Sequence, residues 1–151
     1  MSGQLHNLGY LRMATEDAIV AFFKKSITGA TIRPAYTTDK QERSLVVVHA
    51  KNTRERNETD YNLARYLDVE VRVLTYAEAT KLYTAREAHY SLVAQAYHAL
   101  SQSDVVTTLN DLQAARVLFW SCYAKTDAGT IEDSSYVSTI DIEIGATPKE
   151  D

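Results

Sequence analysis

Two segments of this chain alternate between apolar and charged residues with a strict period of two. The first segment places Leu67, Val69, Val71 and Val73 on one side of an extended chain, and Asp68, Glu70 and Arg72 on the other. The second segment runs from Tyr136 to Ile144, where Asp141 and Glu143 alternate with isoleucines. Such alternation is typical of strands that bury one face only. The chain must therefore build a sheet with one apolar face and one charged face.

Other patterns predict the elements around these two strands. The expected order is a helix over 15–28, a strand over 45–50, a strand over 64–75, a long helix from 76 or 79 to 100, a short helix over 103–112, and strands over 115–124 and 136–144. A short extended piece is expected at 31–33. Thr15 is the expected N-cap of the first helix, and Gly29 can take the left-handed position at its end. Gly129 is expected to take a positive φ in the acidic link before the last strand.

This order of elements predicts an α+β fold. The expected architecture is a mainly antiparallel four-stranded sheet with two main helices packed on one face. A length of 151 residues fits a single domain over 1–151. The N-terminal segment 1–13 and the C-terminal tail 147–151 are expected to be flexible.

Charge and cysteine content exclude several classes of function. A net charge of -4 argues against tight binding to nucleic acid phosphates. The single Cys122 excludes an internal disulfide and a multi-cysteine metal site. The longest apolar runs are strand-sized, so no membrane span is expected. Residues 1–13 also lack the pattern of a secretory leader, which predicts a cytoplasmic protein.

No catalytic or metal-binding pattern emerges from the residue spacing. The five glycines are scattered, so a phosphate-binding loop is not expected. The histidines have no spacing typical of metal ligands. His49 and Cys122 lack the neighbours that nucleophilic chemistry needs, so both are predicted to be structural. The chain is therefore not expected to be an enzyme, and no catalytic residue, metal or cofactor is assigned.

Tyrosines and a basic stretch are the candidate association surfaces. The chain has ten tyrosines but only three phenylalanines. Tyr83, Tyr90 and Tyr97 recur every seven residues on the long helix, either as a border of the core or as a subunit contact. The polar loop predicted for 51–62 holds Arg54 and Arg56, which are further candidates for a subunit interface. We expect this loop to be mobile until a neighbour orders it.

Residues 14–146 carry a recognisable succession of elements. The segments are, in order, the helix "TEDAIVAFFKKSI", the strand "SLVVVHA", the strand and helix start "ARYLDVEVRVLTYAEA", the short helix "SDVVTTLNDL", and "VLFWSCYAKTDAGTIEDSSYVSTIDIEIGA", in which an acidic glycine turn precedes a final strand. This succession resembles the tail terminator proteins of long-tailed bacteriophages. They belong to a wider set of tail completion and head-tail joining proteins.

The resemblance implies a structural virion protein without catalytic residues. Such a subunit forms a hexameric ring with copies of itself, caps the tail tube protein, stops polymerisation of the tube and meets a head connector or neck protein. It is assembled in the host cytoplasm and resides in the tail or neck of the virion. On this reading the face with Asp68, Glu70, Arg72, Asp141 and Glu143 lines the lumen or meets the next ring, and DNA passes without specific binding.

Three alternatives stay open. The first alternative is another neck or head-tail connector protein of similar fold. A small α+β enzyme is the second, and a deep pocket containing His49, Cys122 or paired carboxylates would favour it. The third is an adaptor that binds one partner through the tyrosine row.

Overall fold

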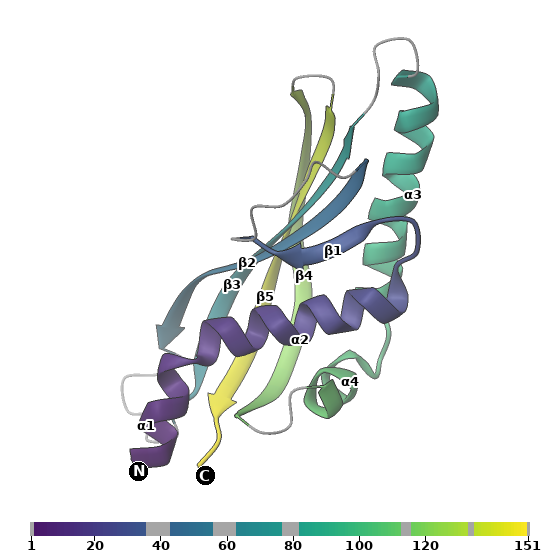
Figure 1. The fold of residues 1–151 in the computed structure, drawn as a ribbon. Helices are drawn as coiled ribbons and strands as arrows, with labels where there is room; N and C mark the ends of the chain where they lie inside the picture. The colour runs from purple at the N-terminus through teal and green to yellow at the C-terminus, as the bar shows by residue number, and fades with distance from the viewer. Residues whose placement is uncertain are drawn as a thin grey trace.

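The computed structural model describes residues 2–35, 43–55, 63–76, 82–112, 116–132 and 135–150. It contains four helices and five strands over these ranges (Figure 1). They are α1 (Ser2–Gly9), α2 (Leu11–Ser26), β1 (Thr31–Pro34), β2 (Ser44–Glu55), β3 (Arg65–Tyr76), α3 (Leu82–Leu100), α4 (Val105–Leu112), β4 (Val117–Glu132) and β5 (Ser135–Pro148). The strands form one sheet in the order β1-β2-β3-β5-β4.

The sheet corrects the predicted fold class. It has five strands and is mixed, because β1 pairs parallel to β2 while the other neighbours are antiparallel. The expected four-stranded, mainly antiparallel sheet with two main helices is therefore wrong. An extended piece at 31–33 was predicted, but a strand as short as the four-residue β1 has no sequence pattern that shows which other strand it pairs with. Pro34 is compatible with β1 because that strand lies at the edge, where a missing N–H leaves no ladder bond unmade.

The N-terminal part of the chain is more helical than its sequence pattern indicated. Helix α2 begins at Leu11, so Thr15 is not its N-cap; the Thr15 hydroxyl donates to the Leu11 carbonyl at 2.7 Å inside the helix. Residues Ser2–Gly9 form α1. The flexibility expected for 1–13 stays a prediction. Gly29 does take a positive φ of 91°, but in the bend that leads to β1 rather than directly at the end of α2.

Two strands are longer than predicted. Strand β2 continues to Glu55, so the polar loop expected over 51–62 can begin only after that residue; 56–62, including Arg56, lie outside the described residues. Strand β4 runs through the segment that was expected to be a link, and Gly129 lies within it without a positive φ. Bulges between Phe119 and Ser121 and between Ala124 and Thr126 allow β4 to continue along β5.

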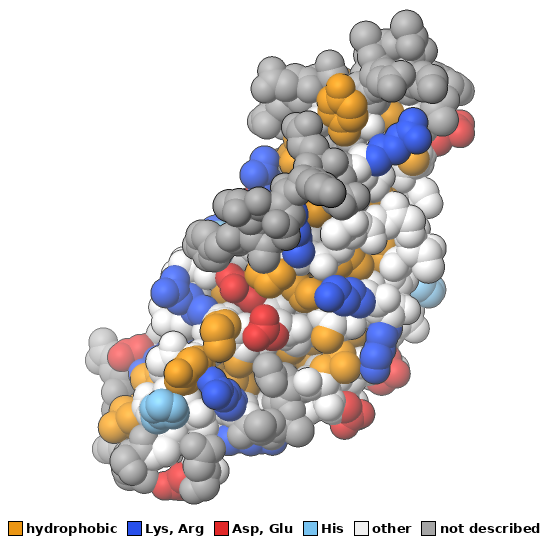
Figure 2. Space-filling model, in the orientation of Figure 1, with side chains coloured by type: hydrophobic (Ala, Val, Ile, Leu, Met, Phe, Trp, Pro, Cys, Tyr) orange, Lys and Arg blue, Asp and Glu red, His pale blue; other side chains and the backbone are white. Residues whose placement is uncertain are grey.

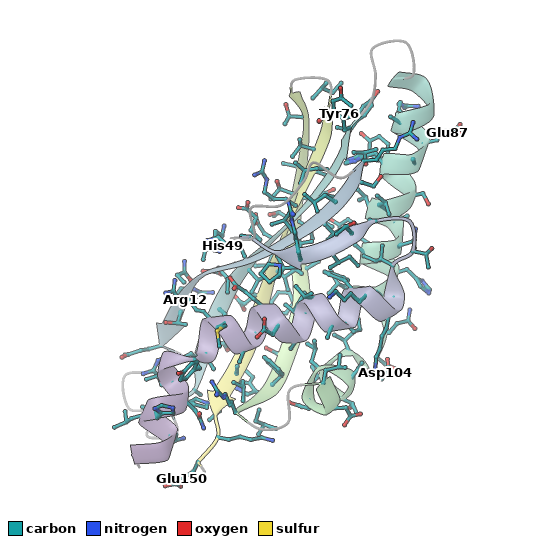
Figure 3. All side chains as sticks on the ribbon, viewed as in Figure 1. Arg12, His49, Tyr76, Glu87, Asp104 and Glu150 are labelled. Carbon is teal, nitrogen blue, oxygen red and sulfur yellow. The ribbon has the colours of Figure 1, made fainter. Side chains whose placement is uncertain are left out.

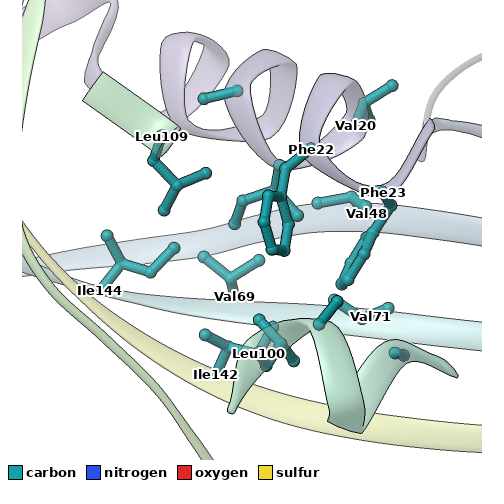
Figure 4. Packing of buried hydrophobic residues seen from close by; sticks show 14 of the residues in the cluster. Val20, Phe22, Phe23, Val48, Val69, Val71, Leu100, Leu109, Ile142 and Ile144 are labelled. Carbon is teal, nitrogen blue, oxygen red and sulfur yellow. The ribbon is translucent and has the colours of Figure 1, made fainter. Parts of the chain in front are cut away.

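The core lies between the helices and the apolar face of the sheet. The alternation predicted for the two strands is confirmed, since Leu67, Val69, Val71, Val73, Ile140, Ile142 and Ile144 are all buried. Phe22 and Phe23 of α2 pack with these residues, as do Leu100 of α3 and Leu109 of α4 (Figure 4). Each such side chain contributes roughly 1.5–3 kcal/mol on burial. This core fixes which face of the sheet is left without helices.

The side that faces the viewer in Figure 1 carries α2. Lysine and arginine side chains are scattered there among hydrophobic and polar ones and do not gather in one patch (Figure 2). Among the described helices, none is both long enough and apolar enough to cross a membrane.

Candidate interaction surface on the open sheet face

The second face of the sheet carries side chains that point away from the core. We call this surface the open sheet face. Its members are Lys51 and Arg54 of β2, Tyr66, Asp68, Glu70 and Arg72 of β3, Trp120, Tyr123 and Lys125 of β4, and Asp141 and Glu143 of β5. The strand register places Asp68 opposite Glu143 and Glu70 opposite Asp141. Directly opposed carboxylates repel one another, so this face requires cations from the flanking strands.

Arg54 is the central cation of the open sheet face. Its Nε and Nη2 donate to the two carboxylate oxygens of Asp68 at 2.9 and 3.0 Å, and Nη2 also donates to Glu143 at 2.8 Å. These hydrogen bonds hold the pKa of Asp68 below its usual value, and they raise the pKa of Arg54 itself. A planar guanidinium is suited to this role because it can bond one carboxylate with two donors.

Lys125 and Tyr123 complete the group around Glu143. The Lys125 Nζ lies 3.5 Å from Glu143 and 3.9 Å from Asp68. The bulge between Ala124 and Thr126 gives Lys125 its place beside these carboxylates. The Tyr123 hydroxyl donates to Glu143, which raises the pKa of Tyr123. The same hydrogen bond, followed by the one from Arg54, lowers the pKa of Glu143.

A second group of charges surrounds Lys51. Its Nζ lies 3.7 Å from Glu70 and 3.6 Å from Asp141, while Arg72 lies 3.9 Å from Glu70. Thr126 donates a hydrogen bond to Asp141 at 3.1 Å. The ion-paired groups of the open sheet face are thus four cations and four carboxylates, whose formal charges cancel. Arg33 of β1, level with Arg72 across β2, adds one further cation at the edge of this face. Lys51, Arg54 and Lys125 come from strand residues that had been predicted as loop or link.

Aromatic side chains occupy one end of the same face. Tyr66 and Trp120 pack edge to face with their ring centroids 5.2 Å apart, and the Arg54 guanidinium lies 5.6 Å from the Tyr66 ring. The indole N–H donates to the Thr147 hydroxyl at 3.2 Å. Gly145 lies beneath the indole, where an added Cβ would come within 2.5 Å of the ring. The lack of a side chain at Gly145 is what lets Trp120 lie flat on the sheet.

A shallow hollow lies between the two charged groups. Its lining residues are Lys51, Asn52, Asp68, Lys125, Thr126, Asp141 and Ile142. In the part of the chain that the structure describes, no group of three histidine, cysteine or acidic side chains is placed to hold a metal ion. The arrangement offers charge-assisted hydrogen bonds to a surface that presses against it, with both signs represented.

The tyrosine row does not form one exposed surface among the described side chains. The Tyr83 side chain lies outside the described residues. Tyr90 is 54% exposed, but Tyr97 packs partly buried against the core. Burial, together with Asp127 of β4, raises the pKa of Tyr97. Tyr97 therefore joins α3 to the sheet of its own subunit, and Tyr90 is left as the candidate contact.

His89 forms a buried polar contact that the sequence pattern did not predict. Its Nδ1 lies 3.0 Å from the Thr75 hydroxyl and its Nε2 lies 2.7 Å from the Ser138 hydroxyl. All three side chains are buried, and burial lowers the pKa of His89. The neutral imidazole thus connects α3 to β3 and β5. The only hint in the sequence was that His89 falls on the apolar arc of its helix.

His49 and Cys122 are not brought together. They lie on β2 and β4, and two strands separate these in the sheet, which corresponds to roughly 14 Å at the usual strand spacing. Figure 3 labels His49. Its Nδ1 lies 3.3 Å from Glu16 of α2, and the same Glu16 oxygen accepts from the Ala50 N–H at 2.8 Å. Burial raises the pKa of the Cys122 thiol to about 12, unlike that of an activated nucleophile.

Comparison with known proteins gives little further information. No family model matches the chain, and no curated protein matches it. Among solved structures, the chain is similar to one in the virion of a native gene transfer agent particle, with 12% identity over 91% of this chain and 92% of that chain. The TM-score is 0.48, which is too low to define a shared fold. By its own fold and surface, the chain belongs to the class of α+β proteins with one uncovered sheet face that carries ion-paired side chains.

Proposed function

We propose that this chain is a structural subunit of a phage-like virion that forms a ring at the head-proximal end of the tail. The ring ends the growth of the tail tube and joins the tail to the head. Its partners are other copies of itself, the tube protein and a neck or connector protein. The sequence resemblance to tail terminators supplies this role, and the open sheet face supports it.

The open sheet face is the observation that carries the proposal. Antiparallel sheets often leave one face in water, but here ion pairs join the charged side chains of β2, β3, β5 and β4 across that face. A helix-free face with ordered charges of both signs fits a surface that lines a lumen or meets another ring. The charges of its ion pairs cancel, which also fits a passage for DNA, because balanced charges do not retain the phosphate backbone by counterion release.

A catalytic role receives no comparable support from the described residues. The buried pair Ser138 and His89 has hydrogen-bond geometry, but Thr75 rather than a carboxylate lies at the other ring nitrogen. Ser138 is only 5% exposed, so its hydroxyl has little access to a substrate. The simplest account of this trio is a tie between α3 and the sheet.

Deletion of the coding sequence from the genome that encodes this chain tests the proposed function. Without a terminator, we expect filled heads that lack tails, together with free tails that are longer than normal. Supplying the wild-type chain from a plasmid should restore attached tails of normal length. Attached tails of normal length in the deletion strain would contradict the proposal.

The same experiment separates the tail terminator from a neighbouring neck protein. Loss of a neck protein leaves tails of normal length that fail to attach to heads. Quantifying the chain in purified particles adds a second measurement, since a hexameric ring requires about six copies per particle. A single copy per particle would rule out the ring.

A further inference from the structure

Strand β4 lies at the edge of the sheet, and its first part is capped. Asn110 of α4 binds both main-chain groups of Phe119, since its Oδ1 accepts from the Phe119 N–H at 2.7 Å and its Nδ2 donates to the Phe119 carbonyl at 2.9 Å. The later part of β4 rises beyond α2 and α4 (Figure 1). Residues 125–131 of this part are all exposed. An exposed edge is a template for another strand, and proteins ordinarily protect it.

The main-chain groups along this later part are free among the described residues. Because the main-chain groups of Phe119 point away from β5, the alternation of antiparallel pairs places those of five later residues at the same edge. They are Cys122, Ala124, Asp127, Gly129 and Ile131. No main-chain hydrogen bond from another described element reaches them. The edge can therefore accept a further strand.

The features of β4 that discourage pairing are confined to its middle. A bulge lies between Ala124 and Thr126, and Lys125 lies within it. The Lys125 ammonium group is directed over its own sheet, 3.5 Å from Glu143. Beyond the bulge, the segment 126–131 contains a single charged residue, Asp127. This segment therefore has little charge with which to repel a neighbouring strand.

The free segment has a pattern that matches its own reverse. Thr126, Ala128 and Thr130 lie on the open sheet face, and the side chains between them lie on the helix-covered side. Two antiparallel copies aligned on Ala128 place Thr126 opposite Thr130, and Ala128 opposite itself. Threonine pairs are favourable cross-strand neighbours, and two alanines fit without a clash. The segment is thus complementary to a second copy of itself.

We propose that the β4 edges of two copies of this chain pair antiparallel about a twofold axis through Ala128. The axis is perpendicular to the sheet, so the two sheets become one and both open sheet faces stay on the same side. On the helix-covered side, Asp127 lies opposite Gly129 and Ala124 lies opposite Ile131. These pairs form roughly eight main-chain hydrogen bonds.

Charge and sterics favour this alignment over its neighbours. Alignment on Asp127 would oppose two carboxylates directly, which is destabilising. Alignment on Gly129 would move Ala124 past the last described residue of β4 and lose its pair with Ile131. With the strands aligned on Ala128, Phe119 of each copy falls beyond the end of the other copy's β4. Helix α4, which caps Phe119, therefore does not obstruct the contact.

Exposed apolar side chains at the end of β4 support the dimer. Ile131 is 61% exposed and Tyr90 is 54% exposed, and both line a hollow together with Gly129 and Tyr136. A second β4 strand at this edge would cover Ile131. A twofold contact closes after two copies, so it protects the edge without open-ended growth of the sheet. The inference concerns the free chain and does not rest on the proposed function.

Charges placed on the twofold axis test the contact. Ala128→Lys alone, or Ala128→Glu alone, opposes two like charges, whereas an equal mixture of the two variants opposes unlike charges. Sedimentation equilibrium should show a wild-type dimer, dimerisation at least about tenfold weaker for each variant alone, and recovery in the mixture. Leu118→Lys, at an exposed position beside the capped Phe119, should dimerise like the wild type.

Circular dichroism spectra equal to that of the wild-type chain confirm that the variants fold. Unchanged dimerisation of Ala128→Lys, a mixture without recovery, or a wild-type chain that stays monomeric up to about 1 mM overturns the inference.

Disulfide crosslinking in a Cys122→Ser background tests the alignment. Facing residues of this kind of antiparallel pair have Cα atoms about 4.5 Å apart, which a disulfide can span. We expect Ala128→Cys to link to itself rapidly. Thr126→Cys should link to a copy with Thr130→Cys but not to itself. Ala128→Cys that links no faster than the control Leu118→Cys would overturn the inference.

The dimer and the proposed function are measured on different samples. Dimerisation is measured on the purified chain, whereas the proposed function is measured by tail length and attachment in particles. A monomeric chain that still ends tails at normal length would overturn only the dimer. A dimeric chain whose deletion leaves tails normal and attached would overturn only the proposed function.

Discussion

Gly145 shows how one residue sets the shape of the open sheet face. Trp120 lies directly over it, and Ser121 and Trp120 atoms would come within 2.6 Å of an added Cβ. The indole cannot withdraw without losing its hydrogen bond to Thr147 and its contact with Tyr66. The packing of Trp120 against Tyr66 therefore depends on the absence of a side chain at Gly145.

Gly145→Ala should lower the free energy of unfolding by roughly 1–3 kcal/mol, the usual cost of forcing an extra group into a packed site. Gly129→Ala is the matched control, because its Cβ would meet nothing closer than 3.5 Å. Urea denaturation followed by tryptophan fluorescence measures both variants. Equal stability of the two variants would show that Trp120 moves aside freely.

Cys122 should be a poor nucleophile. Since burial raises its pKa to about 12, its thiolate is scarce at pH 8. We expect alkylation by iodoacetamide to be roughly a hundredfold or more slower in the native protein than in urea. An exposed thiol, made by Thr53→Cys in a Cys122→Ser chain, serves as control. Rapid labelling of native Cys122 would contradict its assignment as a structural residue.

At the scale of elements, the ion pairs of the open sheet face join three strands side by side. Arg54 of β2 binds Asp68 of β3 and Glu143 of β5. The depressed pKa of each carboxylate means that its stabilising effect is complete above the ordinary values of 3.8 and 4.5. This effect is lost as the pH falls through the lower pKa values of the folded state.

Arg54→Gln should therefore destabilise the protein at pH 7 and cease to matter in acid. The guanidinium is partly exposed, so screening limits the loss at pH 7 to about 1 kcal/mol. Arg72→Gln, which removes one contact at 3.9 Å, should cost less. Urea denaturation at pH 7, 4 and 2.5 measures the difference from wild type. A difference that persists at pH 2.5 would contradict the role of the two carboxylates.

The sequence predicted which helices and strands form better than it predicted where each one begins and ends. Alternation over β3 and β5 was strong enough to assign their buried faces correctly, because burial leaves a period of two. Strand β4 was predicted too short, since a solvent-exposed edge strand such as 125–131 needs no apolar residues. Its bulges shift the pattern as well. Consequently Lys125 was read as part of a link, and its place beside Glu143 could not be foreseen.

At the scale of the whole molecule, acidic residues outnumber basic ones, but the paired charges on the open sheet face are equal in number. The chain carries a net charge of -4, whereas the four cations and four carboxylates of the ion pairs on this face cancel. Its pairing depends on contacts between strands far apart in sequence, such as Arg54 with Glu143. No local pattern contains that information, and for this reason the charge of the surface could not be predicted from β3 and β5 alone.

Neutralising carboxylates on this face should create affinity for DNA where the wild type has little. Glu70→Gln with Asp141→Asn leaves Lys51 and Arg72 unpaired. We expect salt-dependent retention of duplex DNA by this double variant. Asp17→Asn with Glu87→Gln, two exposed positions on helices, changes the net charge equally and should not retain DNA. Fluorescence anisotropy at several salt concentrations distinguishes them; equal binding by both variants would show that net charge alone matters.

The two ends of the described chain meet at one place, because Gln4 and Asn7 of α1 donate hydrogen bonds to the carbonyls of Pro148 and Lys149 at 3.2 and 2.8 Å (Figure 1). A short linker could therefore join them, and the chain could be reopened elsewhere as a circular permutant. The same proximity means that a fluorescent tag on either terminus would emerge near α1. A tag there would leave the end of β4 and the start of β5, at the far end of the molecule in Figure 1, unobstructed.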